Sequence, residues 1–126
     1  MEAHTSMELL HLWHGALVES VRKEGPDLSS RQMAILLTVY LTDQPHTVRG
    51  LAARLGVAKP VVTRALDTLG RMGLLKRRRD DRDRRNVLVQ RTVKGAVYLS
   101  EFCDLIAHVQ GRCETAEPRQ SETTAA

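Results

Sequence analysis

The run RRRDDRDRRN, residues 77 to 86, constrains the fold of this chain more than any other segment. It holds six arginines and three aspartates and nothing apolar, so burying it would remove nine charges from water. The flanking runs LLKRRR and NVLVQRT are short and β-prone, which predicts a β-hairpin with an exposed, charged tip. Such a tip is usually only solvated surface, so whether it has a binding function must be judged from the elements around it.

Those elements are predicted to be helical, because apolar residues recur at spacings of three and four. The expected helices cover about Ser6–Lys23, Ser29 or Ser30 to Leu41, Arg49–Leu55, Lys59–Met72, and Val93 into the 110s. The expected apolar faces are Leu10, Trp13, Leu17 and Val21 in the first helix, Met33, Leu36, Leu37, Tyr40 and Leu41 in the second, and Val97, Leu99, Phe102, Leu105, Ile106 and Val109 in the last. The fold class is therefore mainly α with a small β-hairpin wing.

The two central helices, joined by a tight turn at Gly56, predict a helix-turn-helix. In the second of them Val62, Leu66 and Leu69 form the buried face. The opposite face carries Lys59, Pro60, Val61, Thr63, Arg64 and Thr68, a mixture of donors and methyl groups that suits a DNA major groove. A two-helix corner alone also occurs in proteins that bind no DNA. The hairpin that follows directly gives the order of a winged helix.

Charge is distributed unevenly and indicates a polyanionic partner. The chain of 126 residues has a net charge of +4, but residues 49–94 carry fourteen Lys and Arg against four acids, a local net of +10. The remaining residues have a net of −6. Double-stranded DNA is the first candidate, because arginine suits a narrow minor groove. Aromatic residues make up only 3%, too few for base-stacking platforms on single strands.

Residues 30–95 resemble the DNA-binding domain of the MarR family of bacterial winged-helix regulators. The segment LAARLGVAKPVVTRALDTLGRMGLL is similar to the family's helix-turn-helix, and DRRNVLVQRT resembles its wing signature, with Asp83, Arg85 and Val89 in place. TVKG matches the start of the next helix. The resemblance implies a transcriptional regulator in which Arg85 enters the minor groove, Asp83 orients it, and the start of the Lys59–Met72 helix reads bases. We expect the other wing arginines to contact phosphates: Arg77, Arg78, Arg79, Arg82 and Arg84.

Four departures from the family pattern affect these expectations. Ala58 stands where a capping Ser or Asp is common, and Pro60 and Val61 replace small hydroxylated residues, which favours readout by methyl contact and shape. Arg91 replaces a leucine, which is expected to weaken inward packing of the second wing strand. The family has two C-terminal helices, but only one is expected here.

The family dimerises through its terminal helices, so we expect a homodimer and allow for a small-molecule effector near its interface. The expected organisation is an N-terminal dimerisation helix (1–27), a winged helix-turn-helix (28–92), a second dimerisation helix (93–113) and a disordered tail (114–126).

Other readings remain open beside this one. The winged helix could bind a protein partner, or the chain could act as a ligand or redox sensor through Cys103 or Cys113, although Cys103 is expected to pack as an apolar residue. His11 and His14 have the spacing of two metal ligands without a clear third, so no metal or other cofactor is expected. Trp13 is expected in the core, with a ligand-pocket wall as the alternative.

Enzymatic, membrane and secretory functions find no support in the sequence. It has no nucleophile motif and no phosphate-cradling glycine loop, and Asp67 is expected to pair with Arg64 or Arg71 and not to act as a base. No apolar run of membrane-spanning length and no signal peptide pattern occurs, and two cysteines do not make a disulfide framework. We therefore expect a cytoplasmic protein.

Overall fold

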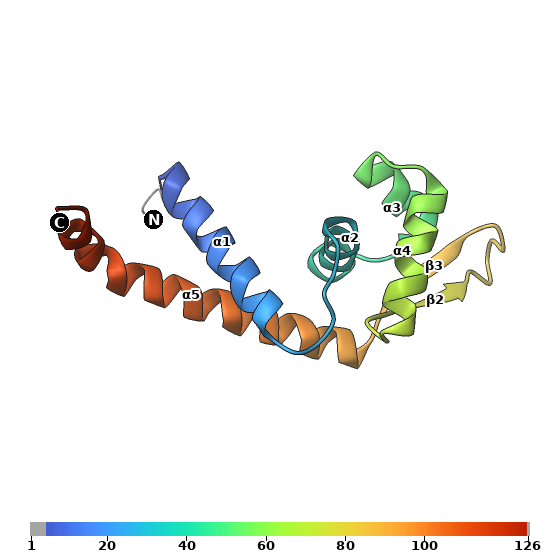
Figure 1. Ribbon diagram of the computed structural model, residues 1–126. Helices are drawn as coiled ribbons and strands as arrows, with labels where there is room; N and C mark the ends of the chain where they lie inside the picture. Colours follow the sequence, from blue (N-terminus) through green and yellow to red (C-terminus); the bar gives the residue numbers. More distant parts are fainter. Residues whose placement is uncertain (1–4, 126) are drawn as a thin grey trace. The chain divides into compact units, whose positions relative to one another are not determined.

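The computed structural model describes residues 5–125, and their side chains from residue 5 to residue 112. The elements are α1 (Ser6–Arg22), α2 (Ser30–Leu41), β1 (His46–Thr47), α3 (Val48–Leu55), α4 (Lys59–Arg71), β2 (Leu75–Arg79), β3 (Val87–Arg91) and α5 (Val93–Ala125) (Figure 1). Contacts divide the chain into a winged-helix unit, Leu28–Leu99, and a terminal unit made of residues up to Asp27 and from Ser100 onward. The predicted fold class, mainly α with a small wing, is confirmed.

Local sequence signals set the ends of the helices in the winged-helix unit. α2 is capped by Ser29, whose hydroxyl accepts from the Gln32 amide while the Gln32 side chain accepts from the Ser29 amide, a capping box. α3 ends at Gly56, which has a positive φ of 67° that only glycine adopts at no steric cost. α4 has no side-chain cap at Ala58, as expected from the sequence, and has proline in its first turn.

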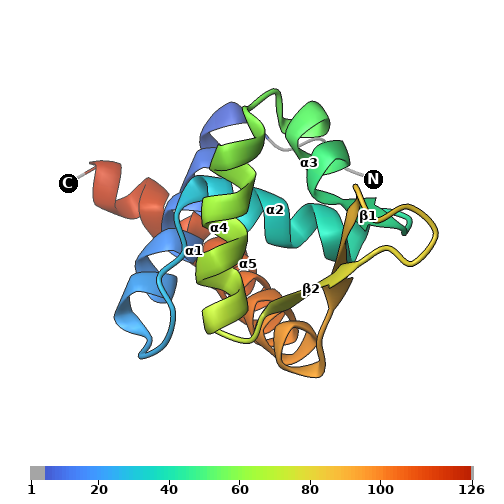
Figure 2. The same ribbon diagram turned by 90° about the vertical axis from the view of Figure 1, so that its right-hand side faces the viewer.

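The wing belongs to a three-stranded antiparallel sheet of order β1-β3-β2 (Figure 2). β2 and β3 form the predicted hairpin, and their pairing runs from Leu75 opposite Arg91 to Arg79 opposite Val87. β1 was not predicted, because a strand of two residues shows no periodicity. Its His46 pairs with Val89 and is buried, with Nε2 3.1 Å from the Thr42 hydroxyl.

The core of this unit is aliphatic. It is formed by Ile35, Leu36, Val39, Val48, Leu51, Ala52, Val62, Ala65, Leu66, Leu69, Leu74, Leu75 and Val89. The predicted buried face of α4 is confirmed, whereas that of α2 is partly wrong, since Ile35 and Val39 are buried and Leu41 is 75% exposed. α2 is apolar around most of its circumference, so spacing alone could not identify the face that packs on α4 and β3.

Arg91 anchors the wing to α2. Its Nε donates to the carbonyl of Val39 at 2.9 Å, its Nη2 donates to the carbonyl of Thr42 at 3.2 Å, and the guanidinium lies 5.7 Å from the Tyr40 ring centroid. These carbonyls belong to the C-terminal end of α2, where backbone acceptors lack partners within the helix. The sequence predicted weaker inward packing at this position, and the structure shows polar anchoring by Arg91 in place of an apolar contact.

In the terminal unit, α1 uses a different face from the one predicted. Ala16 and Leu12 pack against Leu105 and Val109 of α5, and Gly15 lies so close to Val109 that a Cβ would overlap it. The predicted apolar stripe stays outside this contact. Its residues are 43–69% exposed: Leu10, Trp13, Leu17 and Val21. Trp13 is thus not a core residue of the single chain.

α5 continues to Ala125, beyond the 110s where the sequence predicted its end and a disordered tail. Glu114, Ala116, Glu117, Arg119 and Gln120 of this segment have high helix propensity, whereas Thr115 and Pro118 do not. Cys113 lies outside the residues whose side chains are described. Over the described residues, none of the helices combines the length and apolarity that a membrane crossing requires.

Candidate nucleic-acid interface

The polar face of α4 lies opposite its buried face, as predicted. Lys59, Pro60 and Arg64 are exposed, while Val61, Thr63 and Thr68 are half-buried. Thr68 is engaged within its own helix, since its hydroxyl accepts from Arg71 Nη2 at 3.2 Å. The groups most open to an approaching ligand are therefore those in the first turns of α4. Ala58 provides no side-chain cap at this end, where Pro60 has no amide hydrogen and the Val61 amide donates to the carbonyl of Ala58.

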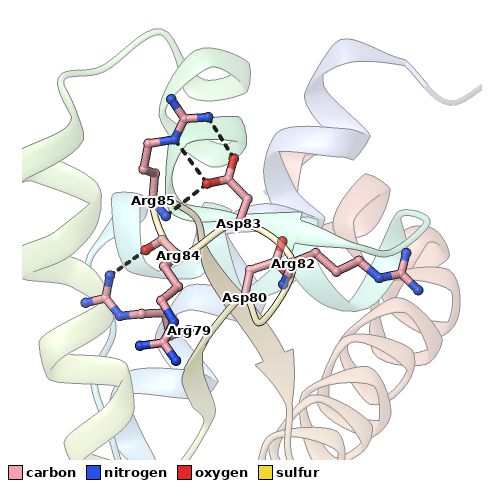
Figure 3. A network of polar contacts seen from close by, with 6 residues as sticks. All are labelled: Arg79, Asp80, Arg82, Asp83, Arg84 and Arg85. Carbon is pink, nitrogen blue, oxygen red and sulfur yellow. Dashed lines mark hydrogen bonds and ion pairs between the residues drawn. The ribbon is translucent and has the colours of Figure 1, made fainter.

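The wing tip is ordered by its own hydrogen bonds (Figure 3). The Arg82 amide donates to Asp80 Oδ1 at 2.9 Å, and the Arg79 guanidinium donates to the carbonyl of Arg84 at 2.6 Å. Two backbone bonds, Asp80 to Asn86 and Asn86 to Asp83, close the turn. Aspartate side chains that accept from an amide two residues on are typical turn formers. The tip thus presents its arginines from a defined backbone.

Asp83 holds Arg85 through three hydrogen bonds (Figure 3). Its Oδ1 accepts from the Arg85 amide at 3.1 Å and from Nε at 3.0 Å, and its Oδ2 accepts from Nη2 at 3.2 Å. The Arg85 side chain remains 82% exposed. It is therefore oriented and still open to solvent, the state in which an arginine can enter a groove without first being ordered.

The pKa of Asp83 is lowered from its ordinary value, first by the side-chain hydrogen bond from Arg85 and then by the bond from its amide. Arg49 of α3 adds a smaller electrostatic effect in the same direction. The sequence did not predict this influence of α3 on the wing. A depressed pKa means that the contact is complete above the ordinary carboxyl pKa and is lost only as pH falls through the lowered value. Arg85 is consequently held in place throughout the neutral range.

The remaining wing arginines differ in whether their guanidinium groups pair with carboxylates of the protein. Arg78 pairs with Asp81 at 3.1 Å, and Arg77 pairs with Asp67 of α4 at 2.6 Å. In the described part of the chain, the guanidinium groups of Arg82 and Arg84 make no hydrogen bond or ion pair. The expectation that Asp67 pairs with Arg64 or Arg71 is wrong. Helix spacing identifies only partners within a helix, whereas Arg77 is ten residues away on the neighbouring strand.

The other candidate residues lie outside this surface. His11 and His14 are exposed on α1, and the described residues contain no group of three potential metal ligands. Cys103 is a free thiol on α5, exposed where the sequence predicted apolar packing. The predicted residues of α4 and of the wing therefore belong to one unit, whereas His11, His14 and Cys103 belong to the terminal unit.

The comparisons with known proteins agree with this geometry. Residues 28–87 match the model of the MarR family. A search of curated proteins finds no significant match. Among solved structures, the chain is similar to MepR of S. aureus in complex with DNA, with a TM-score of 0.65, 21% identity, and coverage of 96% of this chain and 94% of that one.

Two further structures have somewhat higher identity. The transcriptional regulator BldR from Sulfolobus solfataricus has a TM-score of 0.59 and 26% identity over 94% of this chain and 91% of that one. MarR has a TM-score of 0.57 and 25% identity over 91% of this chain and 78% of that one. The winged-helix domain, residues 28–87, is therefore a MarR-family domain.

Proposed function

We propose that this protein is a transcriptional regulator that binds specific double-stranded DNA sequences, with α4 in the major groove and the wing, residues 77–86, on the minor groove. The observation that carries the proposal is Arg85, which is held by Asp83 and yet 82% exposed at the tip of an ordered wing. An arginine presented in this way suits the strong negative potential of a narrow minor groove. The MepR structure, which contains DNA, shares this fold.

The two DNA-contacting elements have different tasks. At the start of α4, Lys59 and Arg64 supply positive charge, while Pro60 and Val61 offer apolar contact to base methyl groups. Arg77, Arg78, Arg79, Arg82 and Arg84 add sequence-independent attraction to the backbone to differing degrees. Phosphate contacts fix the position of the protein, and base contacts give the sequence preference.

The first test is a titration of the protein against random-sequence and genomic duplexes at several salt concentrations, followed by fluorescence anisotropy. We expect a Kd in the micromolar range or tighter at low salt, because this is the usual scale of electrostatic DNA binding. The logarithm of the association constant should fall linearly with the logarithm of salt concentration. A selected genomic fragment should bind at least about 1,000-fold more tightly than random sequence. Absence of binding at low salt would contradict the proposal.

We further infer that the regulator is a homodimer in which a second copy covers the exposed stripe of α1. Leu10, Trp13, Leu17 and Val21 form one apolar row along the helix, and each is at least 43% exposed in the single chain. Contiguous exposed apolar surface of this kind marks an interaction site. A dimer also spans two half-sites of DNA, which one winged helix cannot do.

Leu10→Glu is expected to convert the dimer to a monomer, since it would place a charge within the apolar row. Sedimentation velocity measures the change, and affinity for a two-half-site duplex should fall with it. Leu41→Glu is the matched control, because Leu41 is even more exposed but lies in the winged-helix unit. A wild-type protein that sediments as a monomer, or equal effects of the two substitutions, would contradict the assigned interface.

A further inference from the structure

The ion pair between Asp67 and Arg77 joins the two elements proposed to contact DNA. Asp67 Oδ1 lies 2.6 Å from Arg77 Nη2, which connects the middle of α4 to β2, the first wing strand. Side chains alternate along a strand, so Arg77 is on the same face of β2 as buried Leu75, the face that packs on α4. The strand thus aims Arg77 at α4, where Asp67 accepts its hydrogen bond.

Asp67 is unlike the three aspartates of the wing tip. Asp80, Asp81 and Asp83 each bond to a wing residue two or three positions away, and so serve the local shape of the tip. Asp67 comes from another element and lies on the helix face opposite the core, three residues beyond exposed Arg64. A carboxylate on this face opposes the approach of phosphates.

The ion pair between Asp67 and Arg77 contributes little to the folding stability of the protein. The side chains of Arg77 and Asp67 are 36% and 44% exposed, and ion pairs this open to water contribute little to folding. Their effect on the charge presented to DNA is larger. While the pair is intact, one arginine of the basic wing is neutralised and directed toward the protein.

From these contacts we propose that Asp67 is a positioning residue that withholds Arg77 from DNA phosphates and thereby limits sequence-independent binding. The inference rests on the proposed DNA-binding function and adds a regulator of its strength. Sequence-independent affinity arises almost entirely from cations that displace counterions from the DNA backbone. Removing one such cation lowers affinity for the excess of non-specific sites, which raises the selectivity available to base contacts.

The test measures binding of the full-length protein to a random-sequence duplex as a function of salt. Asp67→Asn keeps the size of the side chain and removes its charge, which releases Arg77. We expect binding about fivefold tighter at about 0.15 M salt and a salt slope steeper by about one, the values for one additional phosphate contact. Asp104→Asn is the control, because it makes the same change in net charge at an exposed position of α5 outside the winged-helix unit.

The double variant Asp67→Asn with Arg77→Gln separates release of Arg77 from simple loss of repulsion. If Arg77 makes the new contact, the slope and affinity return to the wild-type values. If the gain persists without Arg77, the proposal is overturned. It is also overturned if Asp67→Asn weakens binding, which is the result expected of a pair that only supports the position of the wing.

These outcomes differ from failure of the proposed function itself. Binding by the wild type with no gain in Asp67→Asn overturns the withholding of Arg77 alone. Binding by neither protein at low salt overturns both proposals. Binding by Asp67→Asn but not by the wild type supports the role of Asp67 and shows that it suppresses DNA binding altogether.

Discussion

Replacing Arg85 with alanine is expected to weaken DNA binding roughly 10- to 100-fold, the scale for a side chain that contacts bases in a groove. The side chain is already oriented by two bonds to Asp83, so the wild-type protein loses little conformational entropy when Arg85 is inserted. The loss should be greater on a selected genomic fragment than on random sequence, because groove width depends on sequence. Anisotropy titration of both duplexes at one salt concentration measures the two losses.

Arg84→Ala is the matched control for this experiment. Arg84 is the adjacent residue of the same tip, and its backbone carbonyl, which accepts from Arg79, is unchanged by the substitution. Its guanidinium is expected to contact phosphate only, so binding should fall about fivefold at about 0.15 M salt, similarly on both duplexes. Equal losses for Arg84→Ala and Arg85→Ala would show that the wing attracts DNA by bulk charge, and would contradict insertion of Arg85 in a groove.

Features carried by neighbouring residues were predictable from the sequence. The caps at Ser29 and Gly56, the missing cap at Ala58 and the hairpin all depend on residues close together in the chain. The contact between Asp83 and Arg85 is of the same kind, because it spans two residues, although its role was implied only by the resemblance.

Features that depend on distant residues could not be predicted. The anchoring of Arg91 on α2 joins residues about fifty positions apart, and β1 exists only because β3 offers it a partner. The spacing of apolar residues identified the apolar row of α1. Spacing cannot distinguish a helix face that packs within the chain from one that is exposed in the single chain. Pairing of Asp67 with Arg77 likewise required the packing of β2 on α4.

Gly95→Ala is expected to destabilise the protein by about 3 kcal/mol, the upper end for overpacking a well-packed site. A methyl group there would overlap the Tyr40 hydroxyl and the Leu74 carbonyl oxygen. Neither atom can move freely, because the hydroxyl donates to the Leu74 carbonyl at 2.9 Å and accepts from the Thr92 amide at 2.9 Å. Urea denaturation followed by circular dichroism measures the change as a lower transition midpoint.

Gly95→Ala is expected to lower stability because of the overlap with Tyr40 and Leu74, although the same substitution elsewhere in a helix usually raises it. Alanine in place of glycine inside a helix ordinarily stabilises by up to about 1 kcal/mol. Gly111→Ala tests that baseline in the same helix, since among the described residues a Cβ at Gly111 meets no atom within 4 Å beyond the backbone of its own helix. We expect it to be neutral or stabilising. Equal stability of the two variants would show that α5 does not approach Tyr40 and Leu74 this closely. The base of the wing would then be joined to α5 less tightly than the hydrogen bonds of Tyr40 and Thr92 indicate.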